Sequence, residues 1–391
     1  MTRSKWGLRI PEGMHDLLPA EITLQESLEG KLLALFRGWA YQRVMTPALE
    51  FGACVQPDID KGQHLYKFFD QQGRVLVLRP ELTTPIARLV NTRLSVTELP
   101  LRLCYSADVY RNLEGRRREF RQTGVELIGS NELLADAEVI ALAVEGLRKL
   151  GIKDFQFNLG HMGIFSGLMA EIPISPEMRA QLEELLARKD MVGIELLAEQ
   201  SELPVKVKEM LCRLPHLRGG EEILDEVLSW STSPIVVEAV EGLRKVYRYL
   251  QDFSVQSFVA LDLGILRGFS YYTGAIFEGY APGVGFPVVE GGRYDTLYAE
   301  FGVAAPATGF AINLSSLLEL FALPEANTAE VLVFGKEGSQ VVQLCQKLRE
   351  EGRQVEMLLG VVSATEADEL ASKRNIPSVI DAGMKNLPPV L

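Results

Sequence analysis

The segment spanning residues 101–129, LRLCYSADVYRNLEGRRREFRQTGVELIG, is the part of the sequence that most constrains the fold. Two apolar-rich stretches, 101–110 and 120–128, flank a short polar stretch that contains Gly115. Two strand-like runs on either side of a glycine-containing turn are typical of a β-hairpin. We therefore expect a long hairpin with a polar tip, and we expect the rest of the chain to be organised around it.

This hairpin carries polar side chains that suit a binding site. Gln122 and Glu126 lie four residues apart on the returning strand, so the two-residue period of a strand places both on one face. With Arg111 they provide donors and acceptors for a zwitterion, and burying them without a partner would be costly. A surface hairpin with solvated charges is the alternative. The tip and its shoulders hold five arginines: Arg111, Arg116, Arg117, Arg118 and Arg121.

Composition argues against several functions. The 391 residues carry a net charge of −12, whereas broad nucleic-acid binding depends on Lys and Arg that neutralise phosphates. Any RNA contact would be confined to the hairpin tip. The four cysteines form no CxxC pair and the four histidines no HxxxH spacing, so we expect reduced thiols, no metal site and no cofactor. No apolar run suits a signal peptide or a membrane span, so we expect a cytoplasmic protein.

A strand-to-helix junction precedes the hairpin. After an amphipathic helix predicted at 21–40 and a strand at 41–45, a second strand at 74–79 passes into a helix that begins near Thr83. Glu81 and Thr83 therefore lie where side chains often project into a cleft. Thr83 could instead be an ordinary N-cap of the helix, which does not exclude a ligand role.

The rest of the chain is predicted to mix strands and helices. The pattern indicates a helix at 133–150, strands at 155–159, 257–262, 275–280 and 286–290, a strand and helix at 308–320, and a helical insertion at about 173–252. Gly291 and Gly292 are interpreted as a corner, where adjacent glycines allow close approach. After a linker at 323–327, residues 329–391 follow a βαβαβ pattern, which predicts a small α/β domain.

Four ordered stretches together resemble the catalytic core of histidyl-tRNA synthetase, a class II aminoacyl-tRNA synthetase. They are ELT at 81–83, the hairpin, RGFSYY at 267–272 and GGRYD at 291–295. The resemblance covers about residues 8–320. It implies an α+β fold, with a class II antiparallel sheet flanked by helices in a core of residues 1–322. Residues 323–391 would correspond to an abbreviated anticodon-binding domain.

In that family the matching residues surround histidine. Glu126 and Tyr272 would face the imidazole, the acceptors Glu81, Thr83 and Gln122 would face the α-amine, and two arginines would hold the carboxylate. These roles agree with the hydrogen-bonding chemistry of each group. The implied histidine-binding residues are Glu81, Thr83, Arg111, Gln122, Glu126, Arg267, Tyr271 and Tyr272.

Some of these assignments have alternatives. Arg111 and Arg267 could instead be structural ion-pair partners of Glu81 or Glu126. Tyr271 is expected to lie in the core, because alternation along an extended segment turns it away from Tyr272.

The chain departs from the synthetases on the ATP side. Where they carry an arginine preceded by an acidic residue, in a pattern like GFAxGxERL, this sequence has Ser315 and Ser316. Asn112 and Leu113 follow the hairpin arginine where the family places a glutamate that helps hold adenine, and Ser270 occupies the acidic position of RGxDYY. Loss of one charge-stabilising donor can cost about a hundred- to a thousandfold in rate, so we do not expect adenylation.

A sequence that keeps the histidine-binding residues of the synthetases but lacks their ATP-binding residues resembles the regulatory subunits of short-form ATP phosphoribosyltransferases, a family paralogous to the synthetases. The stretch LGHMGIF at 159–165 agrees with that family. The resemblance implies a chain that is non-catalytic alone, forms a homodimer through its core and joins short catalytic subunits in a hetero-oligomer for the first step of histidine biosynthesis. Free histidine would inhibit the complex, and tRNA binding is not expected. The alternatives are an active histidyl-tRNA synthetase and a decayed scaffold without a histidine site.

Overall fold

The computed structural model describes residues 8–55, 65–94, 99–113, 117–265, 271–324, 329–360 and 362–384. The chain divides into two compact units. The first comprises residues 1–16 and 25–321, and the second comprises residues 17–24 and 322–391.

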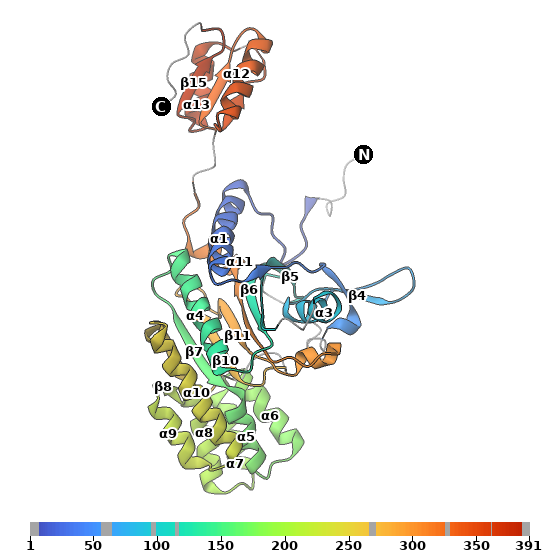
Figure 1. The fold of residues 1–391 in the computed structure, drawn as a ribbon, viewed down its shortest axis with the longest axis vertical. Coiled ribbons are helices and arrows are strands. Elements are labelled where there is room, and N and C mark those ends of the chain that lie inside the picture. The colour runs from blue at the N-terminus through green and yellow to red at the C-terminus, as the bar shows by residue number, and fades with distance from the viewer. Residues whose placement is uncertain are drawn as a thin grey trace. The chain divides into compact units, whose positions relative to one another are not determined.

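A nine-stranded sheet of described residues forms the centre of the first unit (Figure 1). The strand order is β1-β5-β6-β12-β11-β10-β7-β9-β8, with parallel pairing only at β1–β5 and β7–β9. The strands are β1 (Gln42–Arg43), β5 (Leu101–Tyr110), β6 (Glu119–Ile128), β7 (Gln156–His161), β8 (Arg218–Gly219), β9 (Val259–Asp262), β10 (Ala275–Tyr280), β11 (Val289–Arg293) and β12 (Ala307–Asn313). The predicted antiparallel sheet is therefore present, although two of its strand pairs, β1–β5 and β7–β9, are parallel.

The predicted hairpin is formed by β5 and β6. The two strands pair along their whole length, with Leu103 opposite Glu126 and Ala107 opposite Gln122. Val125 and Leu127 alternate with these polar residues and are buried. The tip residues 114–116, including the predicted turn residue Gly115 and Arg116, lie outside the described residues.

Helices cover the apolar face of the sheet. They are α1 (Pro19–Gly38), α4 (Leu133–Leu150) and α10 (Pro234–Asp252). Leu28, Leu32 and Phe36 recur at helical spacing on α1 and are fully buried, and the Phe36 ring packs edge-on against Phe310 of β12 at 5.8 Å. Burying each of these side chains stabilises the fold by roughly 1.5–3 kcal/mol. The opposite face of the sheet carries Glu126 and is covered by α3 (Thr83–Arg93) and the 3₁₀ helix η6 (Leu297–Phe301).

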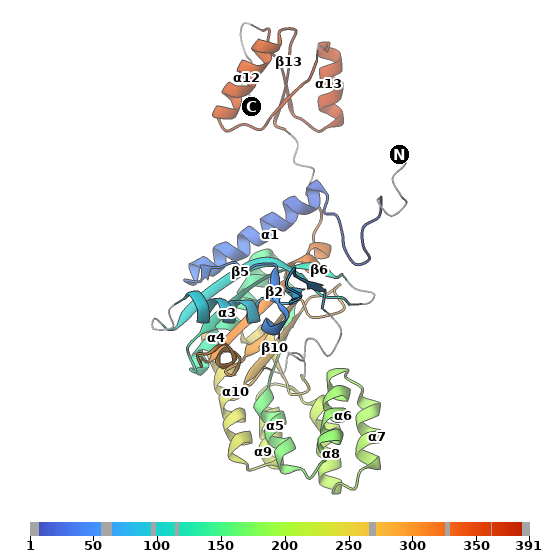
Figure 2. The same ribbon diagram turned by 90° about the vertical axis from the view of Figure 1, so that its right-hand side faces the viewer.

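Short helices gather at one end of the sheet (Figures 1 and 2). Side chains define where two of them begin, because Ser175 accepts a hydrogen bond from the N–H of Met178 and Asp190 accepts one from Gly193. Strand β8 lies within the predicted insertion and was not predicted. The helices are α5 (Met162–Glu171), α6 (Pro176–Ala187), α7 (Met191–Gln200), α8 (Val205–Arg213) and α9 (Glu222–Trp230).

A three-stranded sheet, ordered β2-β4-β3, accompanies the large one. Its strands are β2 (Leu49–Phe51), β3 (Lys67–Phe69) and β4 (Val75–Leu78). β4 leads into α3 (Thr83–Arg93), as the sequence predicted. At the end of the unit, the 3₁₀ helix η6 (Leu297–Phe301) precedes β12, and the short helix α11 (Leu314–Leu317) follows it.

The interpretation of the adjacent glycines as a corner is wrong. Gly291 and Gly292 lie inside β11, which begins and ends three residues later than the strand predicted at 286–290. A Cβ on Gly291 would lie 2.5 Å from the carbonyl oxygen of Gly309, and one on Gly292 would lie 2.6 Å from that of Ala275. The two glycines therefore allow neighbouring strands to approach closely.

The second unit contains a parallel sheet ordered β14-β13-β15. Its elements are β13 (Val331–Phe334), α12 (Gly338–Glu350), β14 (Val355–Met357), α13 (Ala364–Lys373) and β15 (Ser378–Asp381). Val331 and Val333 pack with α12, whereas Leu332 and Phe334 pack with α13. The element order is the predicted βαβαβ order, with one helix on each face.

Candidate amino-acid-binding site

Seven of the eight predicted site residues meet on the face of the large sheet that carries Glu126. Six of them line one cavity, and Glu126 lies within hydrogen-bonding distance of one of the six. The eighth, Arg267, lies outside the described residues, as does Ser270. The residues that line the cavity are Glu81, Thr83, Arg111, Gln122, Tyr271 and Tyr272.

The cavity between these side chains is small. Its volume is about 30 Å³, which is room for about two water molecules. A free amino acid would therefore have to push the lining side chains apart, so binding and local rearrangement are coupled in this pocket.

The start of α3 positions two of the site residues. Thr83 is the first helical residue rather than the N-cap, and its Oγ1 donates a hydrogen bond of 2.9 Å to Glu126 Oε1. Glu81 accepts from the N–H of Thr84 at 3.1 Å with both carboxylate oxygens. The N-cap alternative for Thr83 is thus wrong, because its hydroxyl points across to β6 while Glu81 satisfies the helix N-terminus.

Glu126 is the most deeply buried carboxyl of the site. Its side chain is 1% exposed, and burial raises its pKa well above the ordinary value, a shift that the nearby charge of Glu81 increases. The Thr83 hydroxyl opposes the shift only in part. Among the described residues, Glu126 Oε2 has no hydrogen-bond partner. A buried acceptor of this kind is suited to a donor on a ligand.

Arg111 is held at the other end of the cavity. Its Nε donates to the carbonyl oxygen of Pro80 at 2.7 Å, and its guanidinium lies 5.4 Å from the centre of the Phe120 ring. The positive charge of Arg111 also lowers the pKa of Glu81, whereas burial, the larger effect, raises it. The carbonyl oxygen of Pro80 and the Phe120 ring therefore both contribute to the orientation of Arg111.

Tyrosine rings form one wall. Tyr271 and Tyr272 have centroids 5.0 Å apart, and burial raises the pKa of both hydroxyls. Tyr271 lies in the core, as expected, but it also lines the cavity beside Tyr272, because the segment turns instead of extending as a strand. A Cβ on Gly292 would lie 2.9 Å from the Tyr272 ring, so the absence of a side chain at this position leaves room for the ring.

Three polar lining residues were missed from the sequence: Tyr105, Glu290 and Tyr294. Tyr105 pairs with Gly124, which shares a face with Gln122 and Glu126, so the hairpin register would have found it. Tyr294 belongs to the GGRYD stretch but was given no role. Glu290 had no signal in the sequence, because its place depends on which strand neighbours β11.

The ATP side is occupied by structural contacts. Ser315 of α11 is buried, and its Oγ accepts a hydrogen bond from the backbone N–H of Arg121 at 2.9 Å. The Arg121 guanidinium forms ion pairs of 2.9 Å with Asp108 and with Glu29. A serine that fills the place of the synthetase arginine cannot stabilise phosphate charge.

The arginine of GGRYD is also committed to the fold. Arg293 is 7% exposed and forms an ion pair of 2.9 Å with Asp136 of α4. It donates further hydrogen bonds to the carbonyl oxygens of Ser130 and Glu132. This arginine therefore ties β11 to α4 and its preceding loop.

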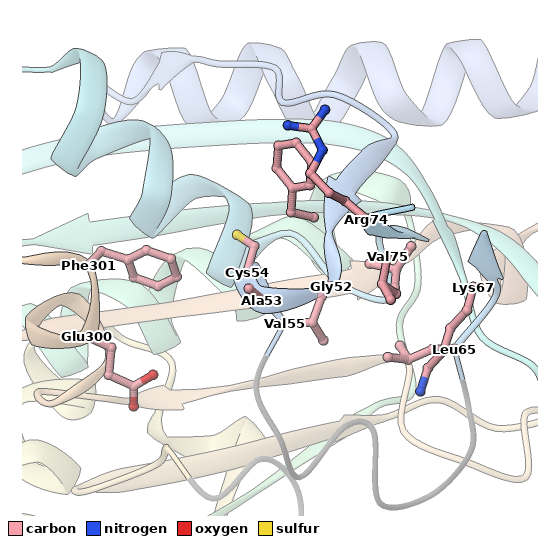
Figure 3. Close-up of a pocket in the computed structure, with 12 residues that line it drawn as sticks. Gly52, Ala53, Cys54, Val55, Leu65, Lys67, Arg74, Val75, Glu300 and Phe301 are labelled. Atoms are coloured by element: carbon pink, nitrogen blue, oxygen red, sulfur yellow. The ribbon is translucent and has the colours of Figure 1, made fainter. Parts of the chain in front are cut away.

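A second pocket, of about 900 Å³, lies between the small sheet and η6 (Figure 3). Its lining is largely apolar, with Cys54 and Phe301 inside and with Lys67, Arg74 and Glu300 as its charged residues. None of the seven predicted site residues that the structure describes lines it. It lacks the opposed carboxylates of the small cavity, so it is not the site that the sequence predicts.

The four cysteines are unpaired thiols, as expected. Within the described ranges, no group of His, Cys, Asp and Glu side chains is arranged to hold a metal ion. In the same part of the chain, no helix has both the length and the apolar character needed to cross a membrane.

Comparison with known proteins identifies the family. The histidyl-tRNA synthetase family model matches residues 13–317. An ATP phosphoribosyltransferase regulatory subunit from Desulfitobacterium hafniense is 58% identical over 382 residues, which cover 98% of this chain and all of that protein. This chain belongs to the family of ATP phosphoribosyltransferase regulatory subunits. The family resemblance inferred from the sequence is thus confirmed.

Solved structures agree with this family and with the fold. A Bacillus halodurans structure described as an ATP phosphoribosyltransferase regulatory subunit/histidyl-tRNA synthetase is 33% identical, with a TM-score of 0.85, and covers 96% of this chain and 98% of that chain. A histidyl-tRNA synthetase from Nostoc, 21% identical, has a TM-score of 0.79 over 94% of this chain and 90% of its own. The predicted class II synthetase-like α+β fold is confirmed.

Proposed function

We propose that this chain is the regulatory subunit of a short-form ATP phosphoribosyltransferase. It catalyses nothing on its own, and it joins short catalytic subunits in a hetero-oligomer. It is required for their activity in the first step of histidine biosynthesis, and it mediates inhibition when free histidine fills the small cavity. Its similarity to a regulatory subunit along 98% of its length carries the proposal.

The chemistry of the cavity supports histidine as the ligand. Glu126 offers an acceptor and Tyr272 a hydroxyl for the two imidazole nitrogens. Glu81, Thr83 and Gln122 offer acceptors for the ammonium, and an arginine suits the carboxylate. An amino acid without ring nitrogens would leave buried polar groups unpaired, which is a strong basis for discrimination. Inhibition then requires only that histidine favour one arrangement of the complex by about 1–3 kcal/mol.

The contacts on the ATP side support a non-catalytic role. Ser315 supplies a hydroxyl where adenylation needs a guanidinium, and that hydroxyl is already used by the backbone of β6. The predicted insertion, 173–252, contains fifteen acidic and ten basic residues. Its net negative charge does not favour binding to the phosphates of a tRNA acceptor stem.

An exposed apolar face supports a homodimer through the core. Phe51 and Phe68 both pair with Leu76 in the small sheet and therefore lie on one face. Their exposed fractions are 48% and 45%, and Leu49 on the same face is 49% exposed. An apolar patch on a two-fold axis meets the same patch on a second copy, so a dimer would cover it.

Co-purification tests the partnership. The chain and a short catalytic subunit would be mixed and separated by size, with the mass of each species measured by light scattering. We expect both chains in one species of defined stoichiometry. Separate elution at every protein concentration would contradict the proposal.

An active histidyl-tRNA synthetase is the second candidate, because the synthetase model matches residues 13–317. ATP–pyrophosphate exchange with histidine separates the two functions, and robust exchange would favour the synthetase. A scaffold without a histidine site is separated by calorimetry, in which no binding at millimolar histidine would favour the scaffold.

A further inference from the structure

The two buried carboxyl groups of the small cavity are satisfied very differently. Both oxygens of Glu81 accept from the N–H of Thr84, and the positive charge of Arg111 acts on this carboxyl group. Glu126 Oε1 accepts a hydrogen bond from the Thr83 hydroxyl at 2.9 Å, and the neighbouring Tyr105 hydroxyl also lowers the pKa of this carboxyl group. Its Oε2 is buried without a partner among the described residues.

The titratable groups around Glu126 bring it no positive charge in the described part of the chain. They are Glu81 from the strand-to-helix junction, Tyr41 from the segment before β1, Tyr105 from β5, Tyr271 and Tyr272 from the segment before β10, and Tyr298 from η6. Arg111, Glu290 and Tyr294 line the cavity beside which Glu126 lies, and the positive charge of Arg111 acts on Glu81.

A carboxylate in this position would be costly when the cavity is empty. A buried ionised group without a counter-charge is disfavoured by desolvation, and the negative charge of Glu81 adds repulsion. The neutral acid avoids both costs. A bound amino acid changes the balance, because its ammonium brings a positive charge next to both carboxyl groups.

We propose that the cavity exchanges a proton for its ligand: Glu126 is a protonated acid when the cavity is empty and becomes a carboxylate when an amino acid with a neutral imidazole binds. This inference rests on the proposed histidine site. The O–H bond of Glu126 breaks, and its proton passes to solvent. The carboxylate then accepts from one imidazole N–H, while the other ring nitrogen accepts from the Tyr272 hydroxyl.

Histidine sensing would therefore depend on pH. Where the empty cavity holds the Glu126 proton and the filled cavity does not, histidine affinity rises tenfold for each unit of pH. The same histidine concentration would then act more strongly at alkaline than at acidic pH. Well above pH 6.5, where free histidine already has a neutral imidazole, a purely structural role for Glu126 would give no such dependence.

Calorimetry of histidine binding counts the protons. Titrations of the full chain in buffers of different ionisation enthalpy give the number released, and these would be repeated from about pH 5.5 to about pH 8.5. The imidazole of free histidine titrates near pH 6.5, so release well above that value comes from the protein. Glu126→Gln removes the proton in question. Glu195→Gln makes the same change at an exposed position on α7 and is the matched control.

We expect the chain and the Glu195→Gln control to release about one proton more than Glu126→Gln. We also expect histidine affinity to rise with pH in step with that release. Binding without protein-linked release anywhere in this range would overturn the proton exchange and leave the histidine site standing. If Glu126→Gln does not bind, the unmodified chain alone decides, through its release between about pH 7 and pH 8. Absence of any binding heat would contradict both the proposed histidine site and the proposed proton exchange.

Discussion

Replacing Glu126 by Gln isolates the cost of a buried, poorly satisfied carboxyl group in the unliganded protein. Gln resembles the neutral acid in shape, so it keeps an acceptor for the Thr83 hydroxyl but cannot ionise. Burial raises the pKa of Glu126 in the folded state well above 4.5, the ordinary value for a glutamic acid side chain in water. A group with a raised folded pKa contributes stability that is full below the unfolded value and is lost as pH rises through the folded value.

The expected change in the free energy of unfolding with pH follows from the titration of one proton. Between pH 4.5 and the folded pKa, the contribution of Glu126 falls by about 1.4 kcal/mol for each pH unit. The variant and the unmodified chain should therefore be equally stable near pH 4.5, and the variant should become the more stable as pH rises. Over two units the difference reaches about 2.7 kcal/mol if the folded pKa lies above that range.

Urea unfolding at a series of pH values measures this difference, followed by a probe of the first unit so that the second unit does not mix into the result. Glu195→Gln should show no such trend, because its carboxyl group is exposed. A constant difference between Glu126→Gln and the unmodified chain across the series would refute the reasoning, since it would mean that Glu126 ionises normally in the folded protein.

Three further substitutions test separate parts of the account. Thr83→Val removes one of the proposed acceptors for the histidine ammonium, a hydrogen bond to a charged group worth about 1.5–3 kcal/mol, so calorimetry should show histidine affinity reduced by about 10- to 150-fold, whereas Thr83→Ser should retain it; equal affinity in both would contradict the site. Arg293→Met leaves the Asp136 carboxylate buried without its cation and should lower the free energy of unfolding by about 3–5 kcal/mol; a loss below about 1 kcal/mol would contradict its structural role. Phe68→Glu should shift the proposed dimer towards monomer in light scattering, and an unchanged dimer mass would place the interface elsewhere.

The hairpin and its site could be predicted because their signals are local. Strand alternation places Gln122 and Glu126 on one face without knowledge of any other strand. The junction at Glu81 and Thr83 was also visible, since a strand runs directly into a helix. The hydrogen bond from Thr83 to Glu126 was not, because it depends on how α3 sits against β6.

Other features needed the tertiary structure. Gly291 and Gly292 were interpreted as a corner because adjacent glycines usually mark turns. In the structure they lack the Cβ atoms that would collide with backbone atoms of the neighbouring strands. Glu290 reaches the cavity only through the order of strands in the sheet. The sequence indicated that the two glycines allow close approach, but it did not show that they lie inside a strand or which strands approach them.

The phosphoribosyl-transfer activity of a short catalytic subunit, measured with and without this chain and over a range of histidine concentrations, tests the central claim most directly. The account predicts activity that requires the chain and that falls as histidine is added. Activity that is independent of the chain, or that histidine leaves unchanged in its presence, would contradict the account.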